Sequence, residues 1–108
     1  GTEHWWLQRV TAIANIPLVI FLVIFVIRHL GASRAEIVAS IANPFVAILL
    51  ALTFVSVLWH MRLGLQVVIE DYVHGHVAKF AALLANSFVT VLLGVAALYA
   101  ILKMSFGL

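Results

Sequence analysis

Three long apolar stretches constrain the fold of this chain more than any other feature of its sequence. No Asp, Glu, Lys or Arg occurs from Val10 to Ile27, and 23 residues without these charges separate Lys79 from Lys103. Another apolar stretch starts near Pro44. The 18 residues of the first stretch would form a helix about 27 Å long, close to the thickness of a hydrocarbon core of about 30 Å. The chain is therefore predicted to be an all-α integral membrane protein, a single domain over residues 1–108 with three transmembrane helices at about residues 10–28, 44–70 and 79–103.

The composition excludes most other classes of protein. Hydrophobic residues make up 66% of the 108 residues and charged residues 9%, whereas soluble proteins average about 25% charged residues. A soluble domain this small would expose most of these apolar side chains. A net charge of +2 without any basic run gives no indication of nucleic-acid binding. Because cysteine is absent, the chain can form neither a disulfide nor a thiolate site for zinc or an iron–sulfur cluster.

Polar and small residues at helical spacing mark the faces that should meet other helices. Gln8, Thr11 and Asn15 form such a stripe at the start of the first stretch, and we expect it to face helices rather than lipid. A cleaved signal peptide is the competing interpretation of this stretch. A signal peptide is removed from the mature protein, so a polar stripe that packs against other helices would have no role in it. A second stripe, in the last stretch, predicts close helix packing. Its members are Ser87, Thr90, Gly94 and Ala97.

The segment between the first two stretches, residues 28–43, is predicted to hold a short helix on the membrane surface. Its apolar residues Ile37, Val38 and Ile41 recur at helical spacing. Asn43 followed by Pro44 is typical of a helix start, because Asn caps the free N–H groups and Pro suits the first turn.

The most informative stretch for function runs from Ser56 to His76. His60, Gly64 and Asp71 lie four and eleven positions apart, so they share one face of a helix. His60 lies about 16 Å from Asp71 along such a helix, near the middle of the bilayer if Asp71 marks the surface. An imidazole at that depth needs a partner. Two partners remain open from this pattern alone: a haem iron, or a hydrogen bond to a neighbouring helix.

Arg62 lies about 200° from His60 around the same helix, at 100° per residue. It should therefore point away from the His60 face. Gln66 and Glu70 follow it at four-residue steps, so we expect an Arg62–Glu70 ladder through Gln66, or an arginine that reaches toward the membrane surface.

Two segments of the chain resemble the small hydrophobic membrane-anchor subunits of succinate dehydrogenase (respiratory complex II). The first is HWWLQRVTA, residues 4–12, and the second is the order His60, Gly64, Gln66, Val67, Val68, Asp71, Tyr72, Val73, His74, Gly75. The resemblance covers two of the three predicted helices.

This resemblance implies roles for four residues. It implies that His60 is an axial ligand of the iron of haem b and that Arg9 lies near the haem propionates. It implies that Tyr72 contacts ubiquinone, with Asp71 beside it. The residue types alone favour simpler roles for Arg9 and Tyr72, as an interfacial arginine and an aromatic anchor at the headgroups. A metal site formed by Asp71, His74 and His76 is a further, weaker alternative.

The resemblance also implies a multisubunit complex. A six-coordinate haem needs two axial ligands, and only one histidine lies deep in a predicted span, so a second haem-ligating membrane anchor subunit is expected. An iron–sulfur subunit and a flavoprotein subunit would carry the iron–sulfur clusters and FAD, and ubiquinone would be the substrate. The chain alone would catalyse no reaction. A fumarate reductase anchor, or a structural or transport subunit whose His60 only bonds another helix, remain as alternatives.

The expected location is a respiratory membrane, either a bacterial inner membrane or a mitochondrial inner membrane. The resemblance implies that the N-terminus lies on the cytoplasmic or matrix side. The distribution of basic residues points weakly the other way. Arg9 and Lys79 fall on one side, and Arg28, Arg34 and Lys103 fall on the other.

Overall fold

The computed structural model describes residues 2–108, which form four α-helices and no strand. The helices are α1 (Thr2–Arg28), α2 (Arg34–Ile41), α3 (Pro44–Tyr72) and α4 (His76–Ser105). Three of them, α1, α3 and α4, are long and apolar enough to cross a membrane. The predicted all-α fold with three transmembrane helices is confirmed, and each helix extends beyond the predicted span at one or both of its ends.

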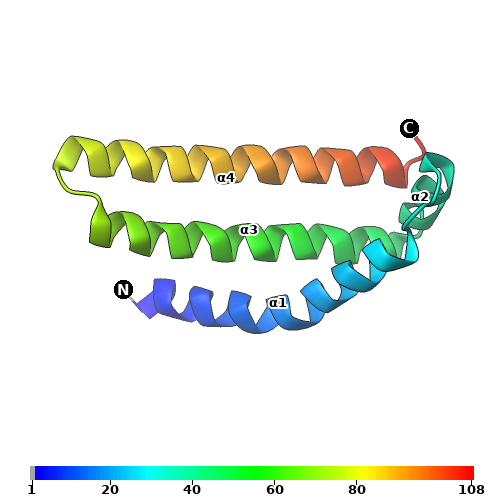
Figure 1. Ribbon diagram of the computed structural model, residues 1–108, viewed down its shortest axis with the longest axis horizontal. Helices are drawn as coiled ribbons and strands as arrows, with labels where there is room; N and C mark the ends of the chain where they lie inside the picture. The colour runs from blue at the N-terminus through cyan, green and yellow to red at the C-terminus, as the bar shows by residue number, and fades with distance from the viewer. Residues whose placement is uncertain (1) are drawn as a thin grey trace.

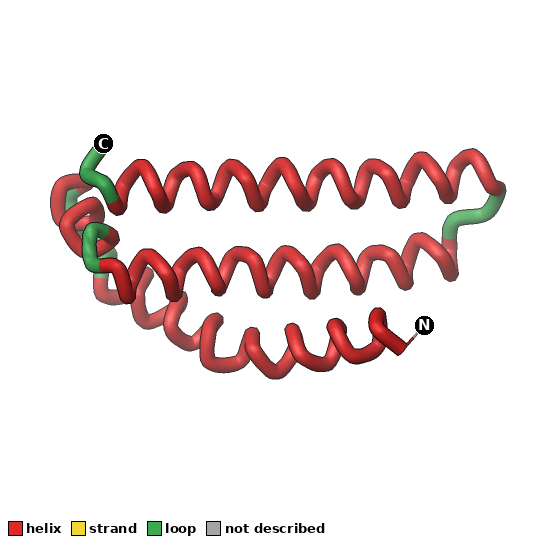
Figure 2. Tube along the Cα trace, turned by 180° about the vertical axis from the view of Figure 1, so that it is seen from behind, coloured by secondary structure: helices red, strands yellow, loops and turns green. Residues whose placement is uncertain are grey.

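The long helices lie side by side in a row with α3 in the middle (Figure 1). Both α1 and α4 pack against α3, whereas no Cα atom of α1 lies within 8 Å of a Cα atom of α4 in residues 2–108. The N-terminus and the α3–α4 turn lie at one end of the molecule, and α2 and the C-terminus lie at the other (Figure 2). This arrangement places Arg9 at the same end as Asp71 and Tyr72, as three consecutive spans require.

Local sequence explains where the helices begin. The Asn43 side chain accepts a hydrogen bond from the Phe45 N–H at 2.9 Å, and Pro44 opens α3, as predicted. Ser33 caps α2 by accepting from the Glu36 N–H at 3.2 Å. The turn between α3 and α4 passes through Gly75 at φ +89°, a conformation that side chains with a Cβ rarely adopt.

The main apolar core lies at the α2 end. Ile41 of α2, Leu50 of α3 and Ile101 of α4 are buried there, and Phe21 and Phe25 of α1 pack against them. Most other apolar side chains of the long helices are exposed, as expected for surfaces that face lipid or other membrane subunits.

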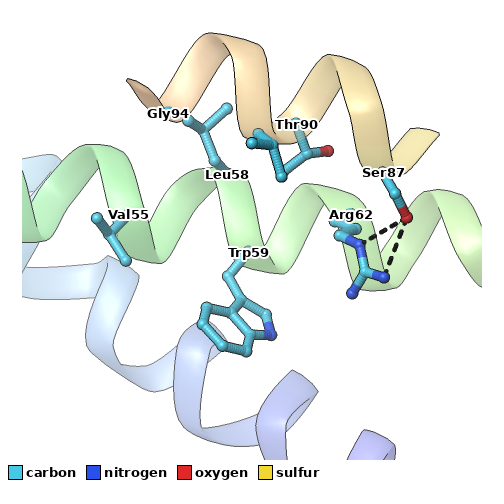
Figure 3. Close-up of a pocket in the computed structure, with 8 residues that line it drawn as sticks. Val55, Leu58, Trp59, Arg62, Ser87, Thr90 and Gly94 are labelled. Carbon is cyan, nitrogen blue, oxygen red and sulfur yellow. Dashed lines mark hydrogen bonds between the residues drawn. The ribbon is translucent and has the colours of Figure 1, made fainter. Parts of the chain in front are cut away.

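Ser87, Thr90 and Gly94 of the small-residue stripe face α3, which confirms the predicted helix packing for these three residues. Thr90 is buried, and the Ser87 hydroxyl accepts hydrogen bonds from Arg62 of α3. A Cβ added to Gly94 would lie 3.8 Å from the Leu58 Cδ1 atom, an ordinary van der Waals distance (Figure 3). Gly94 therefore lies against α3, and it also lines a cavity of about 310 Å³ between the two helices (Figure 3).

This geometry predicts different outcomes for two substitutions at Gly94. Gly94→Leu should destabilise the α3–α4 pair by about 1–3 kcal/mol, because a branched side chain would push against Leu58, which a methyl group would already contact. Gly94→Ala should be close to neutral and serves as the control. Thermal unfolding of the detergent-solubilised complex, followed by its subunit content, measures both effects. Wild-type stability with Leu at position 94 would mean that the adjoining cavity takes up the larger side chain and that close packing at Gly94 contributes nothing to stability.

Candidate functional site

The polar stripe of α1 meets the His60 face of α3, and the two together form the polar α1–α3 interface. The Ser56 hydroxyl donates to the Asn15 Oδ1 atom at 2.6 Å. One turn further along, the Thr11 Oγ1 atom lies 3.0 Å from the His60 Nδ1 atom. The prediction that this stripe faces another helix is confirmed for Thr11 and Asn15. Polar groups that would be costly against lipid satisfy one another here.

The His60 ring uses only one of its two nitrogens within residues 2–108. Nδ1 is bonded to Thr11, while Nε2 has no hydrogen-bond partner there. The surrounding side chains do not fully enclose Nε2. The hydrogen bond to a neighbouring helix, one of the two partners left open above, is therefore present, and the other nitrogen is still free for a ligand.

His29 shows how a histidine looks when its neighbours satisfy it completely. Its Nδ1 atom lies 2.7 Å from the Phe25 carbonyl oxygen, and its Nε2 atom lies 2.7 Å from the Ser40 Oγ atom. The ring also stacks on Phe25, with centroids 4.1 Å apart. His29 joins α1 to α2 and has no nitrogen left over, which distinguishes it from His60.

Gly64 lies one turn beyond His60 and faces α1. A Cβ added there would meet the Gln8 Nε2 atom at 3.7 Å. The sequence left open whether the missing side chain makes room for a macrocycle or for a second helix. Within residues 2–108 the neighbour at Gly64 is a helix, α1.

Asp71 and Tyr72 are adjacent at the end of α3, and both are exposed. Tyr72 exposes 75% of its surface, which leaves its phenol accessible to a ligand or to a partner subunit. Arg9 is also exposed, at the same end of the molecule, with its guanidinium carbon 5.1 Å from the centre of the Trp5 ring. The structure thus brings these three residues to one end without direct contact between Arg9 and the Asp71–Tyr72 pair.

A cavity of about 380 Å³ lies between α1 and α3 near Arg9, and it was not predicted from the sequence. Two polar atoms of the residues that line it, His4 Nε2 and Gln8 Oε1, are enclosed without hydrogen-bond partners within residues 2–108. Gln66 and Glu70 line the cavity from α3. His4 and Gln8 lie four residues apart, as do Gln66 and Glu70, so each pair shares one face of its helix. The sequence did not show that α1 packs on α3, and so it could not show that the two pairs line one cavity.

The predicted Arg62–Glu70 ladder is wrong. The Arg62 guanidinium donates to the Ser87 Oγ atom of α4, from Nε at 3.3 Å and from Nη2 at 3.1 Å (Figure 3). The Asn86 side chain donates to the Arg62 carbonyl oxygen at 3.0 Å. The physical reason is that α3 is the middle helix: the face opposite His60 packs on α4, so Arg62 bonds sideways and does not reach along its own helix to the membrane surface.

A metal site at Asp71, His74 and His76 is not found. No group of three or more His, Asp or Glu side chains in the described part of the chain is placed to hold a metal ion. Asp71, His74 and His76 are therefore not arranged to bind a metal ion together. A cofactor that needs a single protein ligand from this chain is compatible with His60.

Residues 1–94 match the protein family described as succinate dehydrogenase/fumarate reductase transmembrane subunit. The chain is 35% identical to the succinate dehydrogenase membrane anchor subunit of Reclinomonas americana over 86 residues, which cover 77% of this chain and 72% of that protein. It is 32% identical to the hydrophobic membrane anchor subunit of Paracoccus denitrificans over 107 residues, 99% of this chain and 82% of the relative. The corresponding subunit of Rickettsia bellii is 31% identical over 101 residues, 94% of this chain and 81% of the relative. No solved structure matches the chain.

Proposed function

The chain belongs to the succinate dehydrogenase/fumarate reductase transmembrane subunit family, and from this premise we propose that it supplies an axial ligand to a shared haem b and part of a ubiquinone site. Its role as a membrane anchor subunit of succinate dehydrogenase follows from the family and from the three membrane-spanning helices. An anchor of this kind functions within a complex of several subunits in the membrane.

The observation that carries the haem proposal is the Nε2 atom of His60, which has no hydrogen-bond partner within residues 2–108 and is not fully enclosed. A neutral imidazole nitrogen is a common axial ligand of haem iron, and this one lies about 18 Å from the Tyr72 end of α3, well inside the span. His60 would hold the iron. Arg9 lines a cavity with Gln66 and Glu70 of α3, so it lies between the depth of His60 and the Tyr72 end, where it would pair with propionates through charge-assisted hydrogen bonds. When bound, haem b supplies one-electron transfer.

The second axial ligand would come from another membrane anchor subunit. The other four histidines of the chain, His4, His29, His74 and His76, all lie near helix ends. An iron–sulfur subunit and a flavoprotein subunit would carry the clusters and the FAD that oxidise succinate. These two soluble subunits would dock at the end that carries Asp71 and Tyr72, on the cytoplasmic or matrix side, which also places the N-terminus there.

Tyr72 and Asp71 would serve the quinone. Reduction of ubiquinone to ubiquinol takes two electrons, which come from succinate through the partner subunits, and two protons. The Tyr72 phenol would donate a hydrogen bond to a quinone carbonyl and stabilise the negative charge that develops on it. Asp71 would orient this phenol or pass a proton toward the quinone. The exposure of both side chains at the end of α3 supports this proposal.

The test is the composition and the absorbance spectrum of the purified complex. We expect three copurifying subunits, the flavoprotein, the iron–sulfur subunit and a second anchor, together with a reduced-minus-oxidised spectrum of low-spin haem b. Succinate-driven quinone reduction compared with quinol-driven fumarate reduction separates a succinate dehydrogenase from a fumarate reductase anchor. A complex without a Soret band would favour the purely structural alternative, in which the hydrogen bond from His60 to Thr11 is the whole function of the histidine.

A further inference from the structure

We propose that Thr11 is a positioning residue for His60: it holds the imidazole as the tautomer with a proton on Nδ1 and a free lone pair on Nε2. The inference rests on the proposed function, because it concerns the ability of the His60 Nε2 atom to bind haem iron. Its structural basis is the chain of contacts from Leu7 through Thr11 to His60, which crosses from α1 to α3.

The proton of the Thr11 hydroxyl is already committed to its own helix. Its Oγ1 atom lies 2.7 Å from the Leu7 carbonyl oxygen and 3.3 Å from the Gln8 carbonyl oxygen. Two oxygens this close repel each other unless a hydrogen lies between them, and a carbonyl oxygen carries none. The hydroxyl therefore donates to Leu7 and can only accept from His60.

The donor in the Thr11–His60 contact must then be the Nδ1–H group of His60, at 3.0 Å. A neutral imidazole has one N–H group, so a proton on Nδ1 leaves the lone pair on Nε2. That is the nitrogen that has no hydrogen-bond partner within residues 2–108 and is not fully enclosed. The hydrogen bond selects the protonation pattern that ligation through Nε2 requires.

His29 provides the comparison within the chain. Its Nδ1 atom must donate to the Phe25 carbonyl, so its lone pair is also on Nε2, but the Ser40 hydroxyl occupies that lone pair. Both histidines thus carry the lone pair on Nε2, but this lone pair accepts a hydrogen bond at His29 and has no partner within residues 2–108 at His60. The difference lies in the second partner and not in the protonation pattern.

The anchored hydroxyl should also affect a bound metal. A hydrogen-bond acceptor on the second nitrogen of a ligating histidine fixes the ring orientation and raises the basicity of the ligating nitrogen, and its loss typically weakens metal affinity about 10–100-fold. A more basic ligand favours ferric over ferrous iron. Removal of the Thr11 hydroxyl should therefore loosen the haem and raise its reduction potential.

The experiment compares variants of the whole purified complex. Thr11→Val keeps the shape and the branched Cβ but removes the hydroxyl, and Thr11→Ser keeps the hydroxyl. Ser56→Ala is the matched control, because it removes the neighbouring hydrogen bond of the polar α1–α3 interface, to Asn15, and leaves His60 untouched. The measurements are haem transfer to apomyoglobin, the low-spin electron paramagnetic resonance signal and a potentiometric titration of haem b.

We expect about 10–100-fold weaker haem retention, a shifted low-spin signal and a higher potential for Thr11→Val, with wild-type behaviour for Thr11→Ser and Ser56→Ala. If Thr11→Val assembles poorly, Thr11→Ala removes the hydroxyl without adding bulk and should give the same haem changes. If Ser56→Ala changed the haem as much as Thr11→Val, the changes would come from weaker packing of α1 on α3. That result would overturn the inference.

His60→Leu separates failure of this inference from failure of the proposed function. If His60→Leu loses the low-spin haem while Thr11→Val behaves as wild type, the positioning role is overturned and the proposed ligand stands. If neither variant changes the haem, both proposals are overturned.

Discussion

His60→Leu is expected to abolish the low-spin haem b spectrum of the purified complex. Leucine has a similar volume and suits the middle of a membrane helix, so the substitution removes the ligating nitrogen with little cost to insertion. If His60 holds the haem iron as proposed, the substitution would remove that ligand and either change the spin state of the iron or release the haem. A reduced-minus-oxidised spectrum and a haem determination on complexes of equal subunit content measure the effect.

His29 offers the matched control for this experiment. His29→Gln keeps a donor and an acceptor at a position where both ring nitrogens are bonded within the chain, so we expect an unchanged haem spectrum. An unchanged spectrum in His60→Leu would remove His60 from the ligand set. Partial haem retention would indicate that a nearby group fills the vacated coordination position, and a changed spin state would still identify His60 as the native ligand.

Tyr72→Phe is expected to slow quinone reduction several-fold and to leave succinate oxidation by an artificial acceptor near wild type. The substitution deletes only the phenolic O–H group. Loss of a neutral hydrogen bond costs about 1 kcal/mol, or about fivefold in rate, and more when the acceptor gains charge during the reaction. An exposed tyrosine that merely anchors the helix at the headgroups would tolerate phenylalanine.

Both activities should be measured on one preparation. Parallel loss of both would show that the substitution disturbs assembly. Full retention of both would return Tyr72 to a role as an aromatic anchor. Only a selective loss of quinone reduction supports the proposed contact.

Features carried by local sequence could be predicted well. The spans followed from charge-free lengths, and the start of α3 followed from Asn43 and Pro44, because both depend on neighbouring residues only. The helix-facing role of Thr11 and Asn15 followed from their spacing. Each of these features depends on hydrophobic burial or capping within a single helix.

Features that depend on the order of the helices in space could not be predicted. The sequence placed Arg62 on the face opposite His60, but it did not show that α4 would cover that face. Arg62 therefore bonds Ser87 on α4 and not Glu70 on its own helix. The pairing of Thr11 with His60 likewise needed the contact of α1 with α3, although the pattern of each helix marked its residue separately.

The position of the apolar core at the α2 end gives the molecule a gradient of local stability along its length. Within the described chain, no residue from Gly64 to Ala85 is buried and none of α1 is buried, whereas Ile41, Leu50 and Ile101 close the opposite end. Local opening should cost least free energy where few apolar contacts must be broken. The end that carries Tyr72 is thus the end least stabilised by the packing of this chain, and binding of a quinone or a partner subunit there would further stabilise the helix ends. Part of the binding free energy is then spent on this ordering, so affinity at this end depends on how firmly neighbouring subunits have already fixed it.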